Sequence, residues 1–181
     1  MAARNSANSF GWISRALHWL MALGILSTLA LGSFIENMQP SLSNLWLFGL
    51  HKTIGVTLFA AILLRLLWHW ISPPPGPITQ GIPNWQITAS HITHRALYVL
   101  MVAIPLTGWI ASAATGIDVV IFNTLTLPTP VPASETIENI FFLLHGVLTK
   151  LLMFCILLHI AGTLQRQFLR RDQTLRRMTR G

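Results

Sequence analysis

Histidines are the residues of this chain best suited to chemistry. Seven occur among 181 residues, of which 52% are hydrophobic and only 9% charged. Neutral imidazole is the commonest metal ligand in proteins, and burying it costs less than burying a charged group. His145 and His159 have the most informative spacing, because 14 helical residues return to within about 40° of the starting direction and advance about 21 Å. We therefore expect them on one helix face at two depths.

The composition indicates that lipid surrounds most of the chain. An average soluble domain carries about 25% charged residues, so 9% is too little to cover a water-facing surface. Soluble enzyme folds, nucleic-acid-binding modules and disordered regulators are thereby excluded. The single cysteine, Cys155, also excludes an intrachain disulfide, a zinc site made of thiolates and covalent haem attachment through a CxxCH motif.

Four apolar stretches are long enough to cross a bilayer core of about 30 Å as helices, which takes roughly 20 residues each. They comprise residues 12–35, 45–71, 93–114 and 137–164. They are separated by a polar turn, by the proline-rich segment 73–77 and by a longer loop. The apolar piece 119–122 of this loop is expected to lie at the membrane interface or to cap the bundle. The predicted fold is an all-α integral membrane four-helix bundle, with residues 1–181 forming one domain that ends in a basic tail, 165–181.

Basic residues predict the orientation. They lie before the first stretch, around the proline-rich segment and along the tail, whereas the loop after residue 114 has acidic residues and no lysine or arginine. By the positive-inside rule, both termini are expected in the cytoplasm. The net charge of +7 therefore indicates a topology anchor that contacts lipid headgroups rather than nucleic acid. A cleaved signal peptide is the alternative for residues 12–35, but this run is longer than a usual h-region and includes Arg15 and His18.

Each histidine of the last stretch needs a partner at its own depth. In an antiparallel arrangement, His51 lies level with His145, and His18 lies level with His159. Two facing imidazoles on different helices are what a six-coordinate haem iron requires. The spacing favours two stacked haem sites, whereas any one of these histidines taken alone is also consistent with an interfacial or hydrogen-bonded polar residue.

Cations near these levels suit haem propionates. Arg15, Arg65 and Arg95 are placed to serve an inner haem, and Lys52 is placed to serve an outer one. Small residues near the proposed ligands would let a flat ring approach the backbone; they are Gly49, Gly55, Gly146 and Gly162.

The remaining histidines and Lys150 have several interpretations. His69 lies between tryptophans at a helix end, so we expect it, like the tryptophans, in the aromatic belt of the membrane interface. His91 and His94 form an HxxH pair, which suits a metal site, a contact to an inner haem propionate or a quinone. Lys150 lies well inside the last stretch, where a lysine is either functional or extends its amine to the interface.

Together these segments resemble the bacterial cytochrome b561 family of small dihaem membrane cytochromes. The resemblance covers nearly the whole chain in order. It rests on ALHWL at 16–20, HKTIG at 51–55, LRLL at 64–67 leading to the prolines at 73–75, HITHRALY at 91–98, PLTGW at 105–109, HG at 145–146, His159 and DQTL at 172–175.

This resemblance implies two non-covalent haem b groups with His18, His51, His145 and His159 as axial ligands. It also implies electron exchange with quinone in the bacterial inner membrane. Some members of the family are held to oxidise superoxide at the external face and reduce ubiquinone, which would make the protein a superoxide:quinone oxidoreductase. The electron donor is then superoxide or a periplasmic redox partner, and both a monomer and a homodimer are compatible with the sequence.

Two other functions fit the sequence less well. The broader superfamily includes cytochrome b anchor subunits of multi-subunit dehydrogenases, but this chain has only four spans and no long extra domain, which favours the stand-alone type. A metal-ion transporter would need carboxylates along its path, and Glu36, Asp118, Glu135, Glu138 and Asp172 all lie outside the predicted spans.

Overall fold

Four long helices dominate the protein. A computed structural model describes residues 2–180 and contains α1 (Trp12–Glu36), α2 (Leu45–Ile71), α3 (Asn84–Ala114) and α4 (Glu135–Gln165). Within the described residues, these four helices are long and apolar enough to cross a membrane, and in each of them most of the apolar window is not buried inside the protein. The predicted all-α membrane bundle is confirmed.

The helix boundaries follow the apolar stretches closely, with one difference. α3 begins at Asn84 rather than at residue 93, because Pro83 has the extended backbone of an N-cap (φ −60°, ψ 143°) and the polar residues after it continue the helix beyond the apolar window. α4 begins at Glu135, where the Ser134 hydroxyl accepts a hydrogen bond from the backbone N–H of Ile137. A serine cap of this kind stabilises a helix start.

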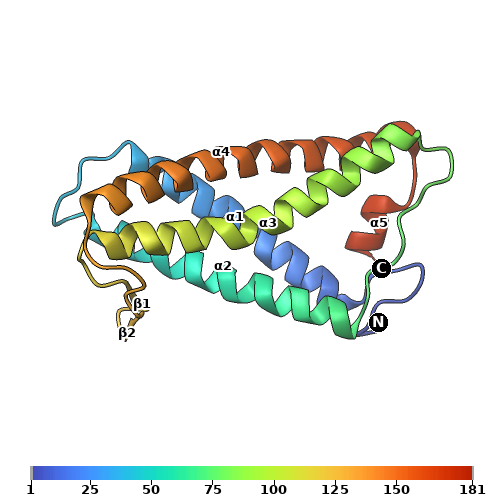
Figure 1. The fold of residues 1–181 in the computed structure, drawn as a ribbon. Coiled ribbons are helices and arrows are strands. Elements are labelled where there is room, and N and C mark those ends of the chain that lie inside the picture. Colours follow the sequence, from blue (N-terminus) through green and yellow to red (C-terminus); the bar gives the residue numbers. More distant parts are fainter. Residues whose placement is uncertain (1, 181) are drawn as a thin grey trace.

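The chain runs up and down, so that both termini lie at the same end of the bundle (Figure 1). We call this the termini end, and the opposite one the hairpin end. At the hairpin end, β1 (Val120–Ile121) pairs antiparallel with β2 (Leu125–Thr126). The hairpin contacts α2, and the backbone N–H of Phe122 donates to Thr53 Oγ1 at 3.2 Å. Val119 and Ile121 are buried, so the apolar piece 119–122 covers part of this end of the bundle.

An apolar cluster fills the middle of the bundle. α3 packs along α4, α1 packs along α2, and α2 contacts α3. Leu100, Leu152 and Cys155 form a buried core against which Ile25 and Leu29 of α1 pack. Leu152 and Cys155 lie in α4 between His145 and His159. The two histidine levels are therefore separated by a layer of apolar side chains.

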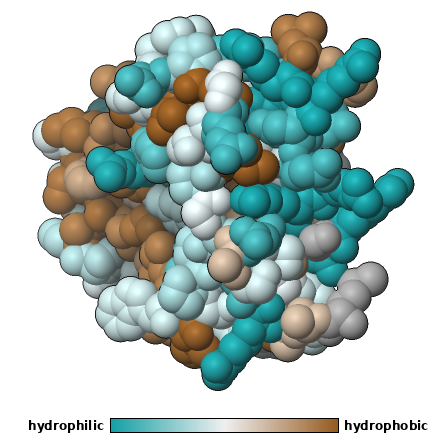
Figure 2. All heavy atoms as spheres, turned by 90° about the vertical axis from the view of Figure 1, so that its right-hand side faces the viewer, coloured by the Kyte–Doolittle hydropathy of each residue, from teal (hydrophilic) through white to brown (hydrophobic). Residues whose placement is uncertain are grey.

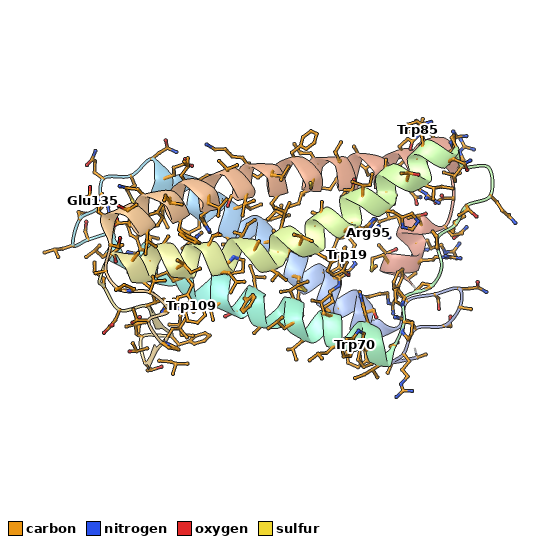
Figure 3. The ribbon with its side chains drawn as sticks, in the orientation of Figure 1. Trp19, Trp70, Trp85, Arg95, Trp109 and Glu135 are labelled. Atoms are coloured by element: carbon orange, nitrogen blue, oxygen red, sulfur yellow. The ribbon has the colours of Figure 1, made fainter. Side chains whose placement is uncertain are left out.

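Tryptophans lie toward both ends of the helices. Trp19, Trp70 and Trp85 are toward the termini end, whereas Trp109 is toward the hairpin end (Figure 3). Trp109 Nε1 donates to the Pro128 carbonyl at 3.2 Å. An indole that combines an apolar ring with one polar donor suits the boundary between lipid and water, where the sequence analysis expects the tryptophans.

The structure gives Lys150 a partner. Its Nζ lies 3.9 Å from Glu36 Oε1 at the end of α1, and both side chains are exposed. The pair joins α4 to α1 and offsets the charge of a lysine that the sequence placed inside a span. Partial neutralisation of this kind lowers the cost of keeping an ammonium group in apolar surroundings.

The C-terminal segment folds back over the termini end. After α4 comes one π-helical turn, η1 (Arg166–Arg170), and then Arg171 has a left-handed backbone (φ 54°, ψ 34°). This reverses the chain into the short helix α5 (Thr174–Thr179). Figure 2 looks onto this end and shows hydrophilic side chains gathered over much of it. The basic tail is thus an ordered surface of the protein.

Hydrogen bonds from basic and aromatic side chains hold the tail in place. Arg15 Nη1 and Trp19 Nε1 of α1 donate to the carbonyls of Thr179 and Met178 at 3.2 and 3.0 Å. From the tail, Arg166 Nη2 donates to the Ile78 carbonyl at 2.7 Å. The tail therefore connects α1, α4 and the loop between α2 and α3.

The carboxylate of Asp172 forms an ion pair and a hydrogen bond within the tail. It forms a 2.6 Å ion pair with Arg166 Nε, and it accepts the backbone N–H of Thr174 at 2.8 Å. Burial alone would raise the pKa of this carboxyl, but hydrogen bonds from Thr174 and Arg166 outweigh it, so the pKa is lowered from 3.8. The contribution of this group to stability is therefore fully present above the pKa of the unfolded chain. It is lost as the pH falls through the lower pKa of the folded state.

We expect Asp172→Asn to loosen the tail at neutral pH. A charge-assisted hydrogen bond contributes about 1.5–3 kcal/mol, so tryptic cleavage at Arg176 and Arg177 should be at least about tenfold faster in the variant. Rates of limited proteolysis of the detergent-purified protein would measure this. Asp118→Asn, in the loop at the hairpin end, is the matched control. Equal cleavage rates for wild type and Asp172→Asn would show that the ion pair does not hold the tail.

Candidate functional site

The structure brings four of the predicted site residues together as two pairs. His51 of α2 and His145 of α4 lie with ring centroids 6.3 Å apart toward the hairpin end. His18 of α1 and His159 of α4 lie with centroids 6.2 Å apart toward the termini end. We call these the outer pair and the inner pair. They are the two pairs that the sequence expected from matching depths.

The spacing of both pairs fits two imidazoles on opposite sides of one metal ion. A bond of about 2.0 Å from each ring nitrogen to the metal, with about 1.2 Å from nitrogen to ring centre, separates two ligand rings by roughly 6.4 Å. The observed centroid separations are 6.2 and 6.3 Å. Direct stacking of two imidazoles would bring the rings closer than this.

A hydrogen bond orients one ring of the outer pair. His145 Nδ1 lies 3.0 Å from the Ile104 carbonyl and 3.4 Å from Thr107 Oγ1. A proton on Nδ1 that is donated to the carbonyl leaves Nε2 as the unprotonated, metal-binding nitrogen. His51 completes the pair with a buried Nδ1 that has no well-formed hydrogen bond within the described residues.

Two glycines make room for the outer pair. A Cβ atom at Gly32 of α1 would lie 3.0 Å from Cε1 of His51, and one at Gly108 of α3 would lie 2.9 Å from Cε1 of His145. Both approaches are closer than ordinary van der Waals contact, so each imidazole occupies space that only glycine leaves free. By contrast, Cβ atoms at Gly49, Gly55, Gly146 and Gly162, which the sequence singled out, would meet no atom within 4 Å.

The inner pair has more polar neighbours. The ring of His94 in α3 lies 5.1 Å from that of His159, and its Nδ1 lies 2.7 Å from the Ser90 carbonyl. Arg65 Nη2 lies 3.3 Å from His18 Nδ1. The Arg65 guanidinium also packs 5.7 Å from the centre of the Tyr98 ring, and its Nε is buried without a hydrogen-bond partner in the described residues. A buried guanidinium nitrogen of this kind suits an anionic group such as a carboxylate.

The other predicted site residues are less closely grouped. Arg15 is buried and donates to the tail, and Lys52 follows His51 directly in α2. Arg95 is exposed toward the termini end (Figure 3) and has no hydrogen bond in the part of the chain that the structure describes. His69 contacts the ring of Tyr98 at 5.8 Å. Among the predicted cations, Arg65 makes a direct contact with a histidine pair, since its Nη2 lies 3.3 Å from His18 Nδ1.

Some contacting residues were missed at the level of sequence. Gly32 and Gly108 touch the outer rings, and Tyr98 lies between Arg65 and His69. Gly108 and Tyr98 lie in PLTGW and HITHRALY, two of the segments that resemble the cytochrome b561 family. This resemblance is the sequence signal that could have identified them. Gly32 had none, because its closeness to His51 depends on how α1 crosses α2.

A membrane four-helix bundle whose helices hold facing histidines is the architecture of a b-type membrane cytochrome. The comparison with known families agrees. The chain belongs to the prokaryotic cytochrome b561 family, whose model matches residues 9–181.

Similar proteins cover nearly the whole chain. Cytochrome b561 homolog 2 of Escherichia coli K12 is 32% identical over 98% of this chain and 95% of its own length. Cytochrome b561 homolog 1 of the same organism is 27% identical over 94% of this chain and 97% of its own. A probable superoxide oxidase, CybB of Yersinia pestis, is 25% identical over 90% of both chains. The protein is accordingly a multi-pass bacterial membrane cytochrome of the b type.

Proposed function

We propose that the protein binds two haem b groups without covalent attachment and transfers electrons between them and quinone. The observation that carries this proposal is the equal spacing of the two histidine pairs, 6.3 Å in the outer and 6.2 Å in the inner pair. His51 with His145 would hold one haem iron, and His18 with His159 would hold the other. When bound, haem supplies a one-electron centre, and ligation by two histidines leaves no open position on the iron for oxygen.

The protein contributes orientation, charge and exclusion of water. The Ile104 carbonyl, 3.0 Å from His145 Nδ1, would hold His145 in the tautomer with a free Nε2. Arg65, Arg15 and Arg95 would neutralise the propionates of the inner haem, and Lys52 those of the outer haem, with Arg65 best supported because its Nε is buried without a partner in the described residues. The apolar core would exclude water from the space between the two pairs.

The two ends would have different reactants. Superoxide, the substrate named for the relative CybB, would donate electrons at the outer pair, and Lys52 beside His51 would attract the anion. Quinone would accept them near the inner pair, where His94 lies 5.1 Å from His159 and is exposed. Two superoxide anions then become two molecules of oxygen, while one quinone takes up two electrons and two protons. We place this reaction in the bacterial inner membrane, with the termini in the cytoplasm.

We expect a reduced-minus-oxidised spectrum of the detergent-purified, haem-supplied protein to show low-spin b-type bands. The pyridine haemochrome assay should give about two haems per chain, since the bundle has two spaced histidine pairs. Addition of superoxide should reduce the haems, and a ubiquinone analogue should reoxidise them. Folded protein with no haem would overturn the proposal. Two haems that superoxide cannot reduce would leave the cytochrome intact and reassign the donor to a periplasmic redox protein.

A further inference from the structure

The reversal of the chain between η1 and α5 forms an open groove on the surface of the termini end. Its volume is about 450 Å³. The lining side chains come from the end of η1 and the beginning of α5, and they are Gln167, Phe168, Arg171, Asp172, Gln173 and Arg176. None of them belongs to the histidine pairs or to the residues proposed to serve the haems.

Four of the six arginines of the tail form two pairs with different contacts. Arg166 and Arg177 donate to backbone carbonyls, of Ile78 at 2.7 Å and of Gly76 at 3.0 Å, so these two hold the tail in place. Arg171 and Arg176 line the groove, are exposed, and make no hydrogen bond or ion pair through their guanidinium groups within residues 2–180. The N–H groups of these two guanidinium groups are thus available at one site to bind a ligand.

The single carboxylate of the groove does not oppose an anion there. Both oxygens of Asp172 are engaged, Oδ2 by Arg166 at 2.6 Å and Oδ1 by the backbone N–H of Thr174 at 2.8 Å. The charge of Arg166 compensates that of Asp172, which leaves the positive charges of Arg171 and Arg176. Paired guanidinium groups with fixed planar donors are suited to the oxygens of a phosphate.

One wall of the groove is apolar and continuous with the lipid-facing surface. Phe168 is 69% exposed and its neighbour Leu169 is 76% exposed. Both lie in η1, which continues α4 and ends the most hydrophobic of the candidate spans, Glu135–Arg170. A ligand with a phosphate beside acyl chains would place the phosphate on the arginines and the chains along Phe168 and the end of α4. A free phosphate would use only the polar wall.

We propose that this groove is a binding site for one anionic phospholipid, which Arg171 and Arg176 hold by its phosphate. The ligand would link the tail to the bilayer at the termini end. The site is independent of haem, and it is more specific than the general attraction of a basic tail to an anionic membrane surface.

Native mass spectrometry of the detergent-purified full chain would test the site, with dioleoylphosphatidylglycerol as probe and dioleoylphosphatidylcholine as the neutral comparison. Wild type should retain about one phosphatidylglycerol per chain in preference to phosphatidylcholine. Arg171→Gln/Arg176→Gln should bind phosphatidylglycerol more weakly by on the order of tenfold, because two phosphate contacts are removed. Each single variant should show part of this loss, and Arg171→Lys/Arg176→Lys should recover part of it.

Arg4→Gln/Arg170→Gln is the matched control. It removes the same charge from exposed positions outside the groove and should leave lipid retention unchanged. An equal loss in this control and in the groove variant would overturn the site in favour of diffuse attraction. Titration with inorganic phosphate separates the two sources of the ligand. If phosphate displaces phosphatidylglycerol at comparable concentrations, the groove binds free phosphate and the lipid assignment is wrong. Gel filtration and thermal unfolding of each variant would verify that it is folded.

Discussion

His145→Ala is expected to lower the haem content from about two groups to about one per chain, and His51→Ala should remove the same group. The reason is that the two rings lie 6.3 Å apart, so that each would supply one axial bond of the same iron, and loss of one strong ligand frees a non-covalent haem. His18→Ala and His159→Ala should instead remove the other group. The pyridine haemochrome assay combined with a redox titration of each variant distinguishes the two centres.

His94→Ala makes this test decisive. The ring of His94 lies closer to that of His159, at 5.1 Å, than does the ring of His18, at 6.2 Å. Under the proposed ligation, His94→Ala and the control His69→Ala keep both haems, while His18→Ala loses one. If His94→Ala loses the inner haem and His18→Ala keeps it, the inner ligand has been assigned to the wrong helix. Loss of the same centre from the His145→Ala and His159→Ala variants would contradict the two-level arrangement altogether.

Gly32→Ala is expected to weaken haem binding at the outer pair without a substitution of any ligand. The added methyl group would lie 3.0 Å from Cε1 of His51, so that the imidazole must move. Displacement of a metal ligand by its surroundings typically costs tenfold to a hundredfold in affinity, and we expect a loss on the order of tenfold. Haem titration of the apoprotein, followed by absorption, would measure it, together with a shift in the potential of the outer centre.

Gly24→Ala is a close control because it lies in the same helix. A methyl group there would approach Cδ2 of Leu58 at 2.9 Å, which is the end of a side chain that can rotate away. Both substitutions raise the helix propensity of α1 by about the same amount, so a general effect on the helix cancels. Equal haem affinities for the two variants would mean that Gly32 does not set the position of His51.

The elements and the pairing of the histidines could be predicted because both depend on local regularities. Apolar length defines the helices, and the spacing between His145 and His159 follows from helix geometry. The loop between α1 and α2 is short, so these helices must run antiparallel, and His18 and His51 fall at opposite levels. The start of α3 at Asn84 could not be predicted from apolar length, because the first turns of this helix contain polar residues and lie outside the apolar window.

Contacts that depend on how two helices cross could not be predicted. The approach of Gly32 to His51 depends on the packing of α1 against α2, and the closeness of His94 to His159 depends on the rotation of α3. The ordered tail was predicted only as a basic segment. Its fold rests on backbone carbonyls, the acceptors of Arg15, Trp19 and Arg166, which carry no sequence signal.

The apolar layer of Leu100, Leu152 and Cys155 gives the proposed reaction a dependence on voltage. It separates the two histidine levels with apolar side chains, so that an electron would cross this layer without an accompanying proton. Moving one elementary charge through the full membrane field involves about 2.3 kcal/mol per 100 mV. With the termini in the cytoplasm, as proposed, electrons that travel from the outer to the inner pair would move toward the negative side of an energised membrane. A high membrane potential would therefore oppose the transfer of electrons across the apolar layer to quinone.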